Sequence, residues 1–158
     1  MNNKLSTLLC VLALFVAPCA WAQDKIGDGT DMQALKSAVA ADKKGLVAST
    51  LDLTPAEAKK FWPLYDAYQR SLDATNRRRS AALEGVIGMN KPMTNLYARN
   101  LSNELTAADE AEIKARRTMQ NRLLKALPAK KAARYLQLEA KIQAVQAYDI
   151  AAAIPLIR

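Results

Sequence analysis

The sequence predicts an all-α fold, an elongated antiparallel helical hairpin with a further helix on either side and four helices in all. Apolar residues return at intervals of three and four along most of the chain, and no segment alternates as a half-buried strand does. The 158 residues include only five glycines. Alanine, leucine, lysine, arginine, glutamate and glutamine are abundant, and these residues favour helices.

Residues 1–22 have the pattern of a secretory signal peptide. Lys4 supplies the positive start, Leu8 to Val16 form the apolar run, and Ala20-Trp21-Ala22 before Gln23 fits a cleavage site. These nine apolar residues are too few for a membrane anchor, which needs about 20. We therefore expect export, cleavage after Ala22 and a periplasmic location.

The exported chain is expected to contain no cysteine, because Cys10 and Cys19 both lie in the signal peptide. A lipoprotein would use Cys19, although Pro18 fits poorly directly before a lipidated cysteine. Residues 23–31 are polar and hold two glycines, which indicates a flexible leader. Residues 32–158 are expected to form a single domain that packing alone stabilises.

The exported chain is strongly basic. Removing Lys4 from the 23 lysines and arginines leaves 22 basic residues against 15 acidic ones, a formal charge of +7. Export and the lack of a nucleic-acid-binding motif argue against nucleic acid as the partner. Acidic segments of unfolded proteins and anionic membrane surfaces are the expected partners of such a surface.

The first helix is predicted from Met32 to Thr50, on the helical spacing of Leu35, Val39, Leu46 and Val47. The second begins with a capping box. Thr54 can cap the amide of Glu57, Glu57 can reach back to the amide of Thr54, and Pro55 suits the first helical position.

The second helix is predicted to continue to Gly88, and Pro63 inside it predicts a kink rather than a stop. One broad apolar stripe supports this length, formed by Phe61, Leu64, Tyr65, Tyr68, Leu72, Leu83, Val86 and Ile87. The aromatic residues Phe61, Trp62, Tyr65 and Tyr68 are assigned to core packing, because their spacing is that of a buried stripe.

After a turn at residues 90–92, Thr94 is the predicted cap of a third helix that ends near Leu127. Its apolar positions are Leu96, Leu101, Leu105, Ala108, Ala115, Met119 and Leu123. An alternative is a separate helix capped within residues 106–109. Pro128 opens the fourth helix, which Pro155 stops. The apolar tail 154–158 either packs back on the bundle or contacts a partner.

The length of the second helix determines the expected shape. Residues 55–88 as one helix would span about 50 Å, whereas a compact globule of this size is about 37 Å across. The second and third helices therefore predict an elongated hairpin onto which the other two fold. Because such a shape buries less surface per residue than a globule, a homodimer is plausible.

The starts of the second and fourth helices share a pattern at an offset of 74 residues, with chance similarity between amphipathic helices as the alternative. The aligned pairs are Leu53 with Leu127, Ala58 with Ala132, Lys60 with Arg134, Phe61 with Tyr135, Trp62 with Leu136 and Leu64 with Leu138.

These features resemble the Spy/CpxP family of small periplasmic proteins, marked by a repeated Leu-Thr-x-x-Gln at helix starts. Leu53-Thr54-Pro55-Ala56-Glu57 matches the motif with glutamate in place of glutamine, whereas the second copy keeps only Leu127. The resemblance implies a helical hairpin, commonly dimerised into a curved cradle. It also implies an ATP-independent chaperone or a stress-linked partner of an envelope sensor.

The family also has a metal-linked branch, but this chain contains no histidine and its exported part no cysteine. Carboxylates and methionines would be the remaining ligands, so no metal and no other cofactor is expected. No Gly-rich phosphate loop or nucleophile elbow is present either. We therefore expect a binding protein and not an enzyme.

Two basic clusters are the predicted client-binding surface. Folding the hairpin about position 90.5 places residue 77 against 104 and residue 67 against 114, so the clusters would lie about 15 Å apart. The predicted residues are Arg70, Arg77, Arg78, Leu83, Lys114, Arg117 and Met119, with the leucine and methionine exposed to touch apolar client segments. The alternative is a solvated face balanced by Glu84, Glu104, Asp109, Glu110 and Glu112.

The expected function is a periplasmic chaperone-like or stress-response protein that binds unfolded or envelope proteins. The alternative is a regulatory module that docks on one defined envelope partner, such as the sensor domain of a membrane kinase. A third interpretation, a peripheral protein on anionic lipid, uses the same basic surface.

Overall fold

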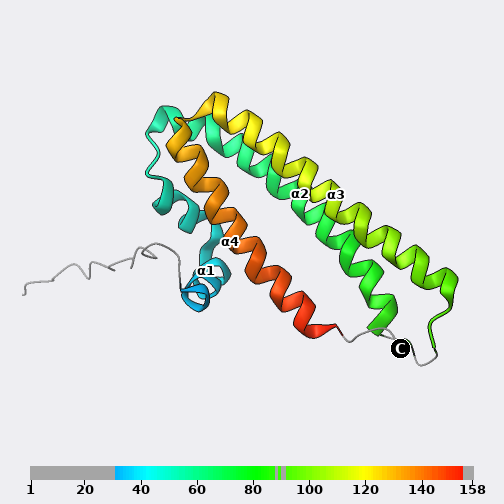
Figure 1. Cartoon of the computed structure of the whole chain (residues 1–158). Helices are drawn as coiled ribbons and strands as arrows, with labels where there is room; N and C mark the ends of the chain where they lie inside the picture. Colours follow the sequence, from blue (N-terminus) through cyan, green and yellow to red (C-terminus); the bar gives the residue numbers. More distant parts are fainter. Residues whose placement is uncertain (1–30, 88, 90–91, 155–158) are drawn as a thin grey trace, which may run out of the picture.

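A computed structural model describes residues 31–87, 89 and 92–154 (Figure 1). This part of the chain contains four α-helices and no strand: α1 (Met32–Leu51), α2 (Pro55–Ile87), α3 (Asn95–Ala126) and α4 (Ala129–Ala153). The predicted all-α class and the four helices are confirmed. The predicted signal peptide, almost all of the predicted leader and residues 155–158 lie outside the described residues.

The helix ends follow the local chemistry of the sequence. The Thr54 amide donates to Glu57 Oε2 at 2.8 Å and the Glu57 amide donates to Thr54 Oγ1 at 3.3 Å, which is the predicted capping box. Thr94 accepts a hydrogen bond from the Tyr97 amide at 3.2 Å, as expected of the α3 cap. The alternative of a separate helix beginning near Thr106 is wrong, because α3 continues through this position.

The backbone leaves helical geometry inside α1, where the sequence predicted an unbroken helix. Asp42 has φ −160° and ψ 91°, and its Oδ1 accepts a hydrogen bond from the Gly45 amide at 2.9 Å. Asp42 thus acts as an internal N-cap for the second half of α1. In contrast, α2 runs through Pro63 as one helix.

The helices pack in two pairs. α2 lies beside α3 and α1 packs against α4, while α4 also touches α3 (Figure 1). Arg78 Nε lies 2.7 Å from Glu104 Oε2, which agrees with the predicted fold-back register of residue 77 against 104 to within one residue. A short connection and antiparallel packing follow directly from this register.

The core lies toward the end at which α2 and α4 begin. Phe61 packs edge-on against Tyr135, with ring centroids 5.2 Å apart, and both rings are fully buried. Tyr65 and Tyr68 are also buried, and burial raises the pKa of each to about 12. Trp62 is half-buried at the edge of this cluster. The assignment of these aromatic residues to packing is confirmed.

The 74-residue echo has a structural counterpart. Phe61 and Tyr135 are equivalent in the echo and contact each other, and Glu57 and Lys131, also 74 residues apart, form an ion pair at 2.7 Å. Two pairs of residues 74 positions apart therefore meet where α2 and α4 begin.

Candidate binding surface

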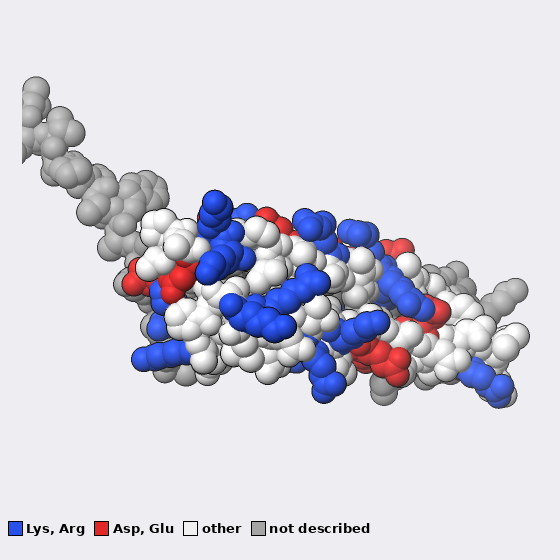
Figure 2. Space-filling model, turned by 90° about the horizontal axis from the view of Figure 1, so that it is seen from above, with Lys and Arg blue, Asp and Glu red and all other residues white. Residues whose placement is uncertain are grey.

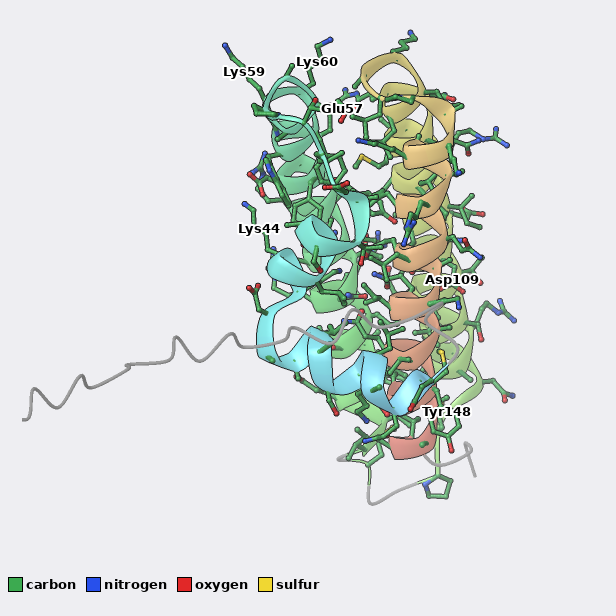
Figure 3. All side chains as sticks on the ribbon, turned by 90° about the vertical axis from the view of Figure 1, so that its left-hand side faces the viewer. Lys44, Glu57, Lys59, Lys60, Asp109 and Tyr148 are labelled. Atoms are coloured by element: carbon green, nitrogen blue, oxygen red, sulfur yellow. The ribbon has the colours of Figure 1, made fainter. Side chains whose placement is uncertain are left out.

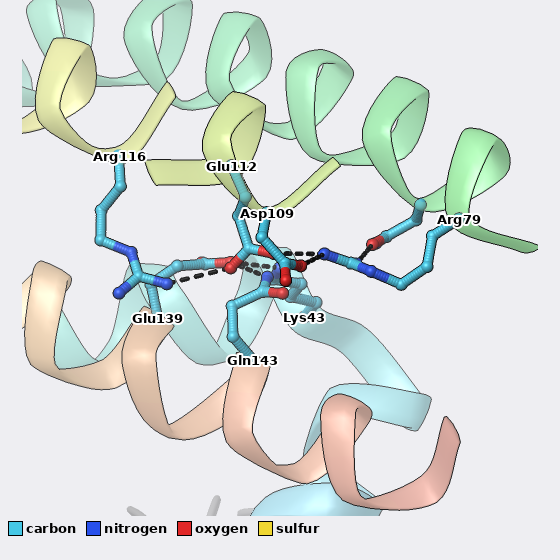
Figure 4. A network of polar contacts seen from close by, with 8 residues as sticks. Lys43, Arg79, Asp109, Glu112, Arg116, Glu139 and Gln143 are labelled. Carbon is cyan, nitrogen blue, oxygen red and sulfur yellow. Dashed lines mark hydrogen bonds and ion pairs between the residues drawn. The ribbon is translucent and has the colours of Figure 1, made fainter. Parts of the chain in front are cut away.

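A buried polar network joins α1, α2 and α4, and Figure 4 shows its members Lys43, Glu139 and Gln143. The Glu139 residue is 2% exposed, and its Oε1 lies 2.8 Å from Lys43 Nζ and accepts a hydrogen bond from Gln143 at 2.9 Å. Tyr135 OH donates to Glu139 Oε2 at 3.3 Å, and Lys43 also donates to Gln69 at 2.8 Å. Because every carboxylate oxygen is bonded within the protein, this network holds helices together and leaves no free reactive group.

A second cluster of charges joins α2 to α3. Arg79 donates to Asp109 at 2.9 Å, to Glu112 at 3.1 Å and to Asn76 at 2.9 Å, and Arg116 pairs with Glu112 at 2.9 Å (Figure 4). Arg79 keeps only 17% of its side-chain surface exposed. Charge-assisted hydrogen bonds of this kind fix the positions of the two helices relative to each other.

A pocket of about 290 Å³ lies between this cluster and the second half of α4. Arg79, Asp109 and Glu112 form its charged side, and Gln146 and Ile150 contribute from α4. Its charges are already paired with one another, so the pocket presents mainly side-chain amides and small apolar groups. Among the described residues, no group of three or more acidic side chains is placed to hold a metal ion.

The predicted client-binding residues differ in exposure and in ion pairing, and the charged ones fall into two groups. Arg70, Arg77, Lys114 and Arg117 are exposed and form no ion pair with another described residue. Arg78 is half-exposed and is held by Glu104, and that hydrogen bond lowers the pKa of Glu104. Three of the acids predicted to balance a solvated face, namely Glu104, Asp109 and Glu112, do pair with arginines of α2.

The prediction that Met119 is exposed is wrong. Met119 is 2% exposed and belongs to the core, on the inward face of α3 that also carries Ala108 and Leu123. These positions recur at four and eleven residues, the spacing of one helix face. Leu83 is half-buried and offers less apolar surface than the prediction required.

The sequence analysis missed two exposed apolar residues on α3. Ile113 is 61% exposed and Leu124 is 50% exposed. They stand four residues before and seven after Arg117, so the three residues follow one face of the helix, with Lys114 beside them. We call this set the α3 face: Ile113, Lys114, Arg117 and Leu124. The sequence signal that could have revealed this face is that its residues are not in helical register with the buried residues Ala108, Met119 and Leu123.

The charge distribution along the chain is uneven. Between Ile113 and Leu138 there are eight basic residues and no aspartate or glutamate, the basic ones being Lys114, Arg116, Arg117, Arg122, Lys125, Lys130, Lys131 and Arg134. This stretch covers the second half of α3 and the start of α4. Figure 2 shows lysines and arginines gathered over much of one face, with few acidic side chains between them.

No family model, curated protein or solved structure matches this chain. The described helices include none that is both long and apolar enough to cross a membrane. The described part of the chain defines its class, a four-helix all-α protein with an extended basic surface.

Proposed function

We propose that this protein is an ATP-independent, chaperone-like binding protein of the periplasm that captures unfolded or stress-exposed proteins on the α3 face. The observation that carries the proposal is the exposure of Ile113 and Leu124 beside Lys114 and Arg117, two cations that form no ion pair with another described residue. Unfolded chains display apolar and acidic segments together, and this face offers a contact for each.

The chemistry of the face suits many unlike clients. Lysine and arginine have long stems that can cover apolar surface while their charged ends reach an acidic group. Apolar side chains spread singly along a helix give several weak contacts instead of one deep pocket, and such contacts favour promiscuity over selectivity. Arg70 and Arg77 on α2 extend the same basic character along the neighbouring helix.

Two features of the sequence support the periplasmic setting. The first 22 residues have the pattern of a signal peptide, and Leu53-Thr54-Pro55-Ala56-Glu57 resembles the motif of the Spy/CpxP family. The long α2–α3 pair supports a Spy/CpxP-like elongated hairpin as the finer description of the fold. A mechanism by binding alone needs neither nucleotide nor cofactor.

The test is suppression of aggregation with the exported, processed protein. Several unrelated denatured proteins should remain soluble at near-stoichiometric ratios without ATP. Added salt should weaken capture, because screening reduces the contribution of the cations and leaves that of the apolar residues. Failure to protect any client would end the proposal. A single tight partner in an envelope pull-down would favour a regulatory docking module instead.

Two double variants locate the surface. Lys114→Glu with Arg117→Glu should lower client capture several-fold, since both attractive charges are reversed. Ile113→Ser with Leu124→Ser should lower the capture that remains at high salt. The matched control is Lys130→Glu with Arg134→Glu, which changes net charge by the same amount away from the α3 face. If the control loses capture equally, net charge and not the α3 face binds clients.

A further inference from the structure

Lys131 links three segments of the chain at the end of the molecule where α2 and α4 begin. Lys131 Nζ lies 2.7 Å from Glu57 Oε2 and donates to the Asp52 carbonyl oxygen at 2.7 Å. These bonds join the α1–α2 loop, the first turn of α2 and the first turn of α4. Figure 1 shows the C-terminal end of α3 and the starts of α2 and α4 meeting there.

Four other cations surround this junction: Lys59, Lys60, Lys130 and Arg134. We call them the basic end. All four are exposed, and none forms an ion pair with another described residue. Lys59 and Lys60 project outward from the start of α2 (Figure 3). Lys60 and Arg134 are an aligned pair of the 74-residue echo, so both helices carry a cation at the same position of the pattern.

Nearby acidic groups do not neutralise the basic end. Glu57 is already bonded to Lys131, and this hydrogen bond holds the pKa of the Glu57 carboxyl below its usual value. The other acidic residue of the junction is the exposed Asp52, in the loop before α2. From Ile113 to Leu138 the chain contributes no acidic residue at all.

The arrangement is unfavourable for the isolated protein. Lys130 lies in the first turn of α4, where the positive end of the helix dipole disfavours a cation. The like charges of the basic end also repel one another. These four charges have no ionic partner among the described residues, whereas an external array of negative charges would attract all of them at once.

We propose that the basic end binds the anionic headgroups of a phospholipid bilayer, so that the protein sits on a membrane surface by one end. The four cations project from two helices and form a patch instead of closing around a single small anion. Near an anionic bilayer each lysine or arginine strengthens binding about fivefold. Contact by this end leaves much of α3 available to other proteins.

The experiment is flotation of the exported, processed protein with lipid vesicles. Vesicles containing phosphatidylglycerol should bind it, and vesicles of phosphatidylcholine alone should not. Raising the salt concentration should release it, because the attraction is electrostatic. Inorganic phosphate at the same ionic strength should have no additional effect. If phosphate released the protein more than other salts of the same ionic strength, the basic end would be a site for a free anion. That result would overturn the proposal.

Matched variants test the position of the contact. Lys130→Glu with Arg134→Glu should weaken vesicle binding about thirtyfold or more, since two favourable charges are lost. The control is Lys114→Glu with Arg117→Glu, which changes the net charge by the same amount. It should bind the vesicles far more tightly than the variant altered at Lys130 and Arg134. Equal losses of vesicle binding in both variants, or no vesicle binding by the unaltered protein, would refute the proposal that the basic end contacts the membrane. Client capture is measured separately, so either proposal can fail alone.

Discussion

At the scale of single residues, Glu139 is the most constrained polar group described. It is 2% exposed, and its carboxylate is satisfied by Lys43 from α1 and by side chains of α2 and α4. A buried carboxylate is tolerable only while its partners remain, because the charge was removed from water when the helices packed. Glu139 therefore couples the position of α1 to that of the other helices.

Lys43→Met should destabilise the protein by about 3 kcal/mol, because it leaves the Glu139 charge buried without its cation. Urea unfolding followed by circular dichroism measures the change. Lys36→Met is the matched control, since the Lys36–Asp149 pair is nearly half exposed at both ends and should contribute less than about 1 kcal/mol. Equal costs for the two variants would show that Glu139 is solvated when α1 is in place.

At the scale of the helices, the boundaries depend on interactions between near neighbours in sequence. The α2 start is fixed by the reciprocal bonds of Thr54 and Glu57, with Pro55 at the first helical position. Each α-helix leaves its first amides without partners inside the helix, so a side chain that accepts their hydrogen bonds decides where the helix begins.

Thr54→Ala should lower the free energy of unfolding by about 1 kcal/mol, because the Glu57 amide loses its acceptor. Thr54→Ser keeps the hydroxyl and should stay within a few tenths of a kcal/mol of the unaltered protein. The measurement is again urea unfolding. The midpoint of the transition should shift while the dependence of the unfolding free energy on urea concentration stays constant. A cost for the serine variant as large as that for alanine would assign the effect to the threonine methyl group.

At the scale of the whole molecule, the long helices α2 and α3 set the size. The 33 residues of α2 span about 50 Å at 1.5 Å per residue. A chain of this length has too few residues to surround such a helix on all sides, so much of α2 and α3 remains at the surface. The exposed Ile113 and Leu124 follow from this shape.

Small-angle X-ray scattering of the monomer should give a maximum dimension of at least about 50 Å, because α2 alone has this length. A compact globule of the same mass would measure about 37 Å across. Measurements over a series of concentrations separate this result from dimerisation, since a dimer would also double the apparent mass. A monomer dimension near 40 Å would contradict the long α2–α3 pair.

The sequence by itself determined the four helices and the caps of α2 and α3, because these depend on periodicity and on contacts over three or four residues. The fold-back register followed from the position of the predicted turn between two long helices. The same reasoning could not find the break at Asp42, where the chain ends one half-helix and caps the next. It also could not pair Lys43 with Glu139, which are 96 residues apart. Such a pair exists only after α1 has packed on α4.

Only the tertiary structure decided that Met119 of α3 faces inward while Ile113 of the same helix stays exposed. Met119 and Ile113 are both apolar residues of α3, yet one is 2% and the other 61% exposed. Helical spacing groups residues into faces, but the rotation of a helix about its axis is chosen by the neighbours against which it packs. For that reason the basic character of the surface was predictable, whereas the exposure of the α3 face was established only by the packed molecule.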